Sequence, residues 1–502
     1  MKKAVSNVFY ITMALVIVFV MVGVIIPEQF EVLTTNVNAF LSTSFGWYYV
    51  WLMSALVFLT IIIAVSPYGK IKLGKADDEP EFSIPTWIAM LFSAGLGIGL
   101  VFYGASEPLS HGFSNAPFGN EGTEQAVKEG IAVTFFHWGI HGWAMYGLFA
   151  LALAFFQYRK GEPGLISATL KPLLGGVMDG FLGTVVNVLA TFATIFGVAT
   201  SLGFGAVQIN GGLHHLFGIN INFIVQFIIV IIVTILFLLS AWSGLGKGIK
   251  FLSNANMILA VLLLLSVLFI GPTLLNLNMF TETFGLYLKN IIPWSFRTAP
   301  LVGDNRNWLD EWTLFYWSWW IAWAPFVGMF IARVSRGRTI RQFIIGVVIA
   351  PTLLISIWFA VFGSTAGYVQ NSGTDLTQYA TELVVFNMFD QLPLSIPLSI
   401  IALLLLMIFF ITSADSATLV LGMQSTRGSL SPPNSVKTAL GLAQSAIALI
   451  LLYVGGLTAL QNTLIAIALP FSIVMILMMI SLVKTLHEEL QMLEGKKKRK
   501  KI

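Results

Sequence analysis

The sequence predicts an all-α integral membrane protein, and three observations support this. Its 502 residues are 57% hydrophobic and only 10% charged, whereas soluble domains carry roughly 25% charge. Apolar runs of about 20 residues, the length that an α-helix needs to cross a bilayer, recur along the whole chain. Lys and Arg gather in alternate connections between these runs. No polar stretch is long enough to predict a separate soluble domain.

The apolar runs predict twelve membrane-spanning helices. They cover approximately 8–27, 46–66, 86–104, 131–156, 181–207, 221–241, 251–271, 312–332, 343–366, 396–421, 437–458 and 463–483. The first run is too long for a signal peptide and lacks a small-residue cleavage site, so we expect it to be retained as a helix. Cysteine is absent, which excludes disulfides, iron–sulfur clusters and thiol nucleophiles.

The positive charges predict the orientation. Of the 27 Lys and Arg residues, all but four fall in connections on one side of the twelve-span arrangement, and the exceptions are Lys128, Lys289, Arg297 and Arg306. Cytoplasmic loops carry such an excess of Lys and Arg. We therefore predict a multi-pass protein of the cell membrane whose N-terminus (1–7) and basic tail (486–502) are both cytoplasmic.

Two segments outside the predicted spans have their own patterns. The connection 272–311 contains FGLYLKNIIPWSF, whose mixture of apolar, aromatic and polar residues predicts a helix lying along the membrane interface. The tail continues the last span for two or three turns and ends in KKKRKK, which would attract anionic lipids. Ordinary anchoring on the positive side of the membrane is the alternative interpretation of that basic run.

An aromatic cluster marks the eighth span. Four tryptophans, at 317, 319, 320 and 323, lie within seven residues of WTLFYWSWWIAWAPFVGMF. Tryptophan normally occupies the membrane interface, but here the cluster extends to the middle of the span. A bulky packing face is one interpretation. The other is an aromatic cage for a cation, since ring faces attract quaternary ammonium groups without carrying charge.

Glycine and proline predict two interruptions within spans. The third span contains Ser93-Ala94-Gly95-Leu96-Gly97-Ile98-Gly99, and each glycine costs about 1 kcal/mol in a helix interior. Local unwinding at mid-membrane is one interpretation, and it is tolerated only where the backbone lines a cavity or is buried in protein. A small-residue packing face is the other. Pro325 and Gly328 predict a softer break in the eighth span.

The fourth span, FFHWGIHGWAMYG, predicts a second aromatic face. Trp138, Trp143 and Tyr146 fall on one side of a helix, whereas His137 and His141 fall on the other. The histidines have the i, i+4 spacing of metal ligands but no third ligand beside them, so we expect hydrogen-bonded packing histidines.

The tenth and fifth spans contain polar side chains. Asp415 is the one carboxylate that falls clearly inside a predicted span, and it is interpreted either as functional or as a hydrogen-bonding tie between helices. Thr412 and Ser413 offer adjacent hydroxyls, hard oxygen ligands that suit a small cation such as sodium. Back-bonding to the helix is the alternative role for such hydroxyls. Thr194 and Thr200 add hydroxyls in the fifth span.

Taken together, these motifs resemble the betaine–choline–carnitine transporter family. The resemblance runs from about residue 8 to 485 and rests on AGLGIGLVFYGASEPL, FHWGIHGWAMYG, YWSWWIAWAPFVGMFIARVSRGRTIR and FFITSADSATL. It implies a LeuT-like five-plus-five inverted repeat after two extra helices, and a homotrimer. The implied divisions are 8–80 for the extra helices, 81–275 for the first repeat, 276–311 for the interfacial region and 312–485 for the second repeat.

The resemblance also implies roles for individual residues. Trp138, Trp143, Tyr146 and Trp320 would form the aromatic box, Trp319 and Trp323 a neighbouring site, and Gly95, Gly97 and Gly99 the unwound segment beside the substrate. One sodium ion would lie among Ser93, Leu96, Phe409, Thr412 and Ser413. A second would involve Thr194 and Phe326, but Val198 stands where the family has a second threonine.

The implied function is sodium-coupled uptake of glycine betaine by alternating access. Choline, carnitine, ectoine or proline betaine as substrate, and protons as the coupling ion, are alternatives within the family. From other classes, a membrane redox enzyme lacks suitable ligands in this sequence, and one broken helix is insufficient for a channel. We expect no enzymatic activity, no cofactor besides the coupling ion, and no nucleic-acid partner.

Overall fold

The computed structural model describes residues 5–95, 97–243, 248–301 and 303–499. Within these ranges the protein is all-α, and an isolated bridge between Lys72 and Thr339 is its one sheet-like pairing. Ten of the described helices are long and apolar enough to cross a membrane. These observations confirm the predicted fold class, while the number of twelve spans stays a prediction.

The two N-terminal helices are longer than their apolar runs. They are α1 (Asn7–Ile25) and α2 (Pro27–Val65), followed by η1 (Pro67–Lys70). The prediction that the second span begins near residue 46 is wrong by about 20 residues, because α2 starts at Pro27 and has 39 residues. No glycine or proline interrupts 28–45, so the helix continues although its sequence becomes polar. This part of α2 packs on the last helix, where Asn38 Nδ2 donates to Asn462 Oδ1 at 3.0 Å.

The third and fourth predicted spans are each divided. The elements of this region are α3 (Ile84–Gly95), α4 (Ile98–Gly104), α5 (Ser106–Phe113), α6 (Glu124–Trp138), α7 (Ile140–Ala154) and η2 (Phe155–Arg159). Of these, α5 lies between the two predicted spans. The predicted interruption of the third span is confirmed by the end of α3 at Gly95 and the non-helical backbone of Gly97. The break at Gly139 was not predicted. The Tyr287 hydroxyl accepts the Ile140 N–H there at 3.2 Å, and so satisfies one backbone donor that the break leaves free.

The middle of the chain contains one predicted interfacial helix. The elements are α8 (Ile166–Thr169), α9 (Lys171–Leu174), η3 (Gly175–Asp179), α10 (Phe181–Phe217), α11 (Phe223–Ser243), α12 (Gly248–Ile270) and α13 (Thr273–Ser295). The helix predicted around 284–296 is therefore confirmed as part of α13, a separate helix of 23 residues.

The second half of the chain differs from prediction in two places. Its elements are α14 (Asp304–Trp308), η4 (Leu309–Leu314), α15 (Phe315–Val334), α16 (Ile340–Asn371), α17 (Thr381–Asp390), α18 (Ser395–Ser425) and α19 (Asn434–Arg499). The softer break predicted at Pro325 is wrong, since α15 continues through it. Neighbouring helices make such prolines tolerable in membrane helices. The eleventh and twelfth predicted spans both lie in α19, which turns at Gly455 and Gly456 rather than at 459–462.

The tryptophan-rich helix α15 lies at the centre of the bundle. It packs against α7, α10 and α19. All of its residues are buried except Phe330 and Arg333, so its indoles face protein and not lipid. The cage interpretation of the aromatic cluster requires this arrangement.

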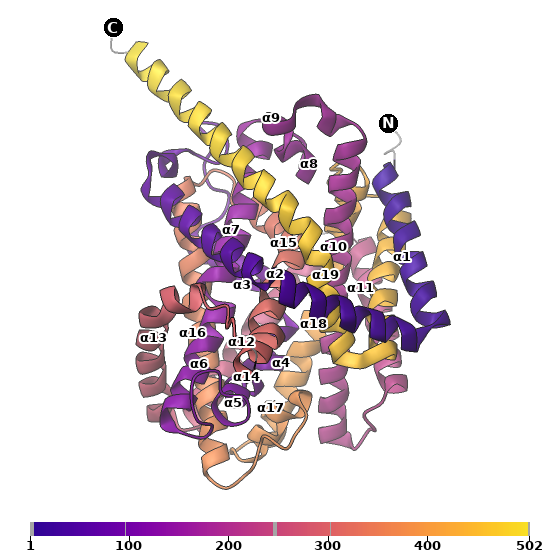
Figure 1. Ribbon diagram of the computed structural model, residues 1–502, viewed down its shortest axis with the longest axis vertical. Helices are drawn as coiled ribbons and strands as arrows, with labels where there is room; N and C mark the ends of the chain where they lie inside the picture. Colours follow the sequence, from indigo (N-terminus) through magenta and orange to yellow (C-terminus); the bar gives the residue numbers. More distant parts are fainter. Residues whose placement is uncertain (1–4, 96, 244–247, 302, 500–502) are drawn as a thin grey trace.

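The basic connections meet at one end of the molecule. Both ends of the described chain lie toward this end, where the last turns of α19 project beyond the bundle (Figure 1). Arg159 and Lys160 pair with Glu489 of α19, and Arg336 Nε lies 3.1 Å from Asp78 Oδ2. The Arg336 guanidinium holds the pKa of Asp78 below its usual range. This grouping fits the predicted common side for the two termini; which side is cytoplasmic stays a prediction.

The contact at the Gly139 break gives a testable prediction. Replacing the fully buried Tyr287 by Phe removes the acceptor of the Ile140 N–H. A buried donor without a partner costs about 1–3 kcal/mol. We expect Tyr287→Phe to lower the midpoint of thermal unfolding of the detergent-purified protein. Tyr368→Phe is the matched control, because Tyr368 is 50% exposed. Equal midpoints for the two variants would contradict the capping role.

Candidate functional site

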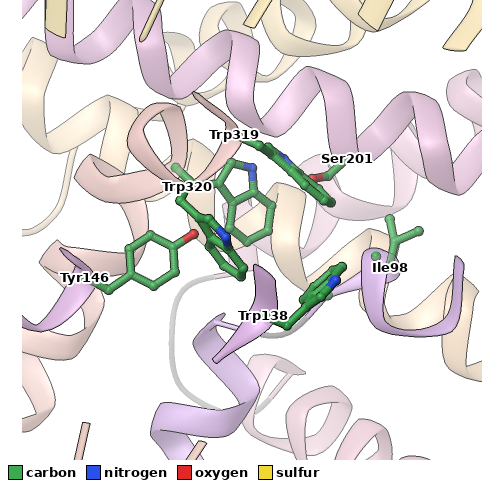
Figure 2. A pocket seen from close by; sticks show the side chains of 9 residues that line it. Ile98, Trp138, Tyr146, Ser201, Trp319 and Trp320 are labelled. Atoms are coloured by element: carbon green, nitrogen blue, oxygen red, sulfur yellow. The ribbon is translucent and has the colours of Figure 1, made fainter. Parts of the chain in front are cut away.

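The aromatic box is assembled from three helices. Trp138 ends α6, Tyr146 lies on α7, and Trp320 lies on α15. The Trp320 ring is nearly perpendicular to both others, with centroids 5.6 Å from Trp138 and 5.1 Å from Tyr146. Figure 2 shows these rings turned toward a common space, with Trp319 on its other side. The predicted grouping of these side chains is what the structure displays, whereas their function as a substrate site stays a prediction.

Trp143 has a different position from the other predicted box residues. It is fully buried and packs edge-on against Tyr146, with centroids 5.9 Å apart. It is not among the residues that line the cavity. Trp143 therefore supports Tyr146 from behind.

A small cavity lies between the rings. It is lined by Gly97, Ile98, Gly99, Trp138, Tyr146, Ser201, Trp319, Trp320 and Trp323. The space open to the centre of a water molecule is about 20 Å³, and one water requires about 10–15 Å³ on this measure. The cavity is thus nearly closed, and a trimethylammonium group could enter only if the rings separated.

Glycine is required where the unwound segment meets the rings. A Cβ atom on Gly99 would lie 2.7 Å from both Trp138 and Trp319, closer than real contacts allow. A Cβ on Gly142 of α7 would likewise lie 2.9 Å from Trp320. Gly95 ends α3.

Hydrogen bonds hold three of the four indoles in place. Trp320 Nε1 donates to the His137 carbonyl at 2.9 Å, and Trp323 Nε1 donates to the Gly197 carbonyl at 2.6 Å. Trp138 Nε1 donates to a Glu107 carboxylate oxygen at 2.8 Å. Side-chain rotation of these rings would break these bonds, so the orientation of each ring face is fixed.

Three polar atoms at the cavity have no hydrogen-bond partner in the described part of the chain. They belong to Tyr146 (Oη), Ser201 (Oγ) and Trp319 (Nε1). Buried polar groups usually have partners, so unpaired ones call for an explanation. They are available to a polar ligand group or to water. Ser201 was missed from the sequence because a serine in a long apolar helix has no distinctive spacing.

A layer of aromatic rings separates the cavity from a larger vestibule. Tyr103 contacts Trp138, with ring centroids 6.2 Å apart, and Phe315 stacks on Trp319 at 5.5 Å. Tyr103 and Phe315 also line the vestibule, whose volume on the same measure is about 500 Å³. Asp310 and Glu311 stand at this vestibule, on the side predicted to be extracellular. One layer of rings therefore lies between the box and that side.

The residues predicted to bind sodium are only partly brought together. Ser413 Oγ would be 3.6 Å from a Cβ on Gly97, so it lies beside the unwound segment. Thr412 Oγ1 donates to the Ile408 carbonyl at 2.9 Å and accepts from Asn256 Nδ2 at 3.0 Å. Leu96 and the side chain of Ser93 lie outside the described residues, so the contacts predicted for them are not visible.

The second predicted sodium position contains no set of oxygen ligands in the described structure. Thr194 Oγ1 donates to the Ala190 carbonyl at 2.8 Å. Phe326 packs edge-on against Trp323 with centroids 5.5 Å apart. Phe409, which was predicted for the first sodium position, is buried on α18. With Val198 in place of a second hydroxyl, this position has little to offer a hard cation.

The other polar residues have structural contacts. His141 Nε2 lies 2.9 Å from Ser295 Oγ, as expected of a packing histidine. Asp415 Oδ2 accepts from Ser240 at 2.5 Å, which ties α18 to α11. A second carboxylate, Glu107 on α5, is fully buried although it lies outside the predicted spans. Glu107 follows the end of the third predicted span (86–104), so the sequence placed it in a connection.

Comparisons with known proteins identify the family of this chain. The family model described as "BCCT, betaine/carnitine/choline family transporter" matches residues 7–491. The glycine betaine transporter OpuD of Bacillus subtilis is 54% identical over 490 residues, which cover 97% of this chain and 96% of that protein.

Two more distant relatives have similar coverage. A probable glycine betaine transporter of Desulfitobacterium hafniense is 41% identical over 97% of this chain and 98% of its own length. An ectoine/hydroxyectoine transporter of Virgibacillus pantothenticus is also 41% identical, with the same coverage. The chain therefore belongs to the betaine/carnitine/choline family of transporters.

Proposed function

We propose that this protein is a sodium-coupled importer of glycine betaine. The observation that supports this proposal best is the cavity wall. Four tryptophans and Tyr146 surround the space, and no carboxylate of the described residues lines it. Ring faces attract a methylated ammonium group through their quadrupole, and they do so without the desolvation cost of a buried acid. The relative from Bacillus subtilis, named a glycine betaine transporter, supports this choice of substrate.

The carboxylate end of glycine betaine would also find hydrogen-bond donors at the cavity. Glycine betaine carries a carboxylate, and the free hydroxyls of Tyr146 and Ser201 and the free Trp319 N–H can donate to it. Choline, which lacks the carboxylate, would leave these donors unpaired. This difference favours glycine betaine over choline.

Sodium coupling and alternating access belong to the proposal. Ser413 and the unwound segment at Gly97 are adjacent to the cavity, so an ion held there would lie beside the substrate. Binding sites at broken helices near the membrane midplane are typical of secondary transporters. The homotrimer and the contact of the basic tail with anionic lipids, both expected from the sequence, are also proposals.

Removing one wall of the box should weaken substrate binding. Cation–π contacts contribute about 1–2 kcal/mol when desolvated, so we expect Trp320→Leu to raise the Kd for glycine betaine by about tenfold or more. Binding can be followed by tryptophan fluorescence of the purified protein. Trp47→Leu is the matched control, since Trp47 is 56% exposed on α2. An unchanged Kd in Trp320→Leu would remove the box from the mechanism.

Removing the two hydroxyls of α18 should weaken sodium binding. We expect Thr412→Ala with Ser413→Ala to raise the sodium concentration for half-maximal betaine uptake into vesicles, because two hard oxygen ligands are lost. Thr281→Ala is the control, since Thr281 is exposed on α13 and only back-bonds to Leu277. Equal accumulation of betaine by the wild type under potassium or proton gradients alone would contradict sodium coupling.

A further inference from the structure

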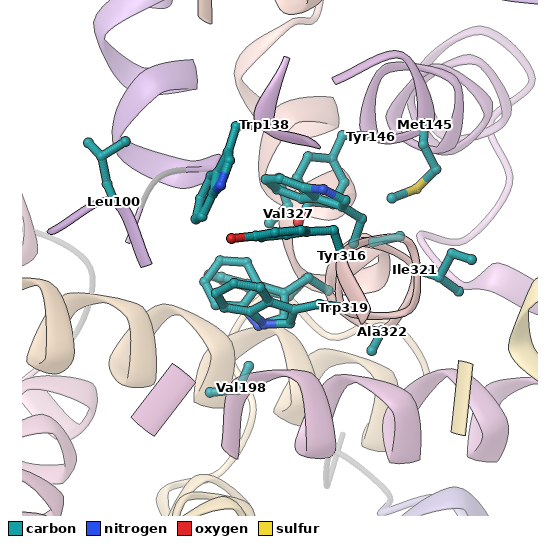
Figure 3. Close-up of a cluster of buried hydrophobic side chains, with 14 of the residues drawn as sticks. Leu100, Trp138, Met145, Tyr146, Val198, Tyr316, Trp319, Ile321, Ala322 and Val327 are labelled. Atoms are coloured by element: carbon teal, nitrogen blue, oxygen red, sulfur yellow. The ribbon is translucent and has the colours of Figure 1, made fainter. Parts of the chain in front are cut away.

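A buried carboxylate lies directly behind the aromatic box. Glu107 is on α5, is 0% exposed, and does not line the cavity. Its Oε2 accepts hydrogen bonds from Trp138 Nε1 at 2.8 Å and from the Tyr316 hydroxyl at 2.5 Å. Figure 3 shows Tyr316 between Trp138 and Trp319, with its hydroxyl end directed toward Trp138. One carboxylate oxygen thus holds a ring from α6 and a ring from α15.

Two histidines surround the other carboxylate oxygen. His137 Nδ1 lies 2.8 Å from Glu107 Oε1, and His111 Nε2 lies 3.4 Å from the same atom. The outer nitrogens have partners that can donate: Trp308 Nε1 lies 3.1 Å from His111 Nδ1, and Thr313 Oγ1 lies 3.0 Å from His137 Nε2. Both imidazoles therefore have a donor on their far side.

The neighbouring groups define the protonation pattern of His111 and are compatible with one for His137. An indole N–H can only donate, so His111 Nδ1 must accept and the His111 proton is on Nε2, facing Glu107. The Thr313 hydroxyl can donate or accept; when it donates to His137 Nε2, the His137 proton is on Nδ1 and faces Glu107. With both histidines neutral, Glu107 receives donors on both oxygens and is satisfied as an anion.

The same three side chains have a spacing that a metal ion could use. The ligand atoms of Glu107, His111 and His137 lie within 4.8 Å of one another. The assigned tautomers, however, direct an N–H rather than a lone pair from each histidine toward the carboxylate. The hydrogen bonds of Trp138, Tyr316 and His137 hold both carboxylate oxygens of Glu107, and its negative charge lies directly behind the box.

We propose that Glu107 is a positioning residue that acts on the cation through Trp138. Its carboxylate fixes the orientation of Trp138 and Tyr316, and it polarises the indole so that the ring face toward the cavity is more negative. A hydrogen bond to an ion polarises its donor, and charges act more strongly at low dielectric than in water. The negative charge of Glu107 thus favours a cation in the cavity, and the Trp138 ring lies between the two. This inference rests on the proposed function, because it concerns recognition of the quaternary ammonium group.

The test compares a ligand whose head group is cationic with one whose head group is uncharged and has the same form. Glycine betaine and tert-butylacetate, the carboxylate (CH3)3C–CH2–COO−, share a carboxylate and three methyl groups. Only betaine has a positively charged nitrogen between them. We expect Glu107→Gln to raise the Kd for betaine by about tenfold and to change the affinity for tert-butylacetate, measured by competition, much less. A merely structural role would weaken both ligands in proportion, and that result would overturn the proposal.

Two further variants keep the test decisive. Tyr316→Phe keeps the ring but removes one donor to Glu107, and we expect the betaine Kd to rise about two- to fivefold. An unchanged Kd in this variant would overturn the proposal even if Glu107→Gln failed to fold or tert-butylacetate failed to compete. Glu382→Gln, which neutralises a buried carboxylate on α17 that does not line the cavity, should leave the ratio of the two affinities unchanged. Failure of the wild type to bind betaine would instead contradict the proposed function itself.

Discussion

The fixed orientation of buried ring faces is the interaction on which the rest of this structure depends. A cation in the middle of a membrane protein needs a partner, and a ring face attracts it only when the ring is turned toward it. The indole N–H groups provide this control, because Trp320 and Trp323 are tied to backbone carbonyls and Trp138 to Glu107. The polar edges of the rings are thus used for anchoring, and their apolar faces remain for the ligand.

The broken helices supply space for these rings and one of their acceptors. His137 lies just before the break at Gly139, at a helix end, and its carbonyl accepts from Trp320. The segment at Gly97 and Gly99 lets two indoles approach the backbone where any side chain would collide. Local irregularities that are costly by themselves therefore make the aromatic site possible, and the surrounding bundle offsets their cost.

The sequence predicted which residues form the site better than it predicted the contacts that hold them. Clustered tryptophans and the GLGIG segment are distinctive motifs, and the family resemblance that they carry placed Trp138, Trp319, Trp320 and Gly97 at one site before the structure was known. Glu107, Ser201 and the break at Gly139 could not, because each depends on a partner distant in the sequence, such as Tyr316 or Tyr287. The start of α2 was missed because hydropathy detects burial in lipid and not helical continuity.

The narrowness of the cavity limits how much water the aromatic site can hold. A space of about 20 Å³ has room for one water molecule, whereas the vestibule outside it is about 25 times larger. A continuous file of water cannot occupy such a constriction, so no water wire for protons or small ions crosses it. The packing of the rings thus gives this arrangement of the transporter a barrier to leakage.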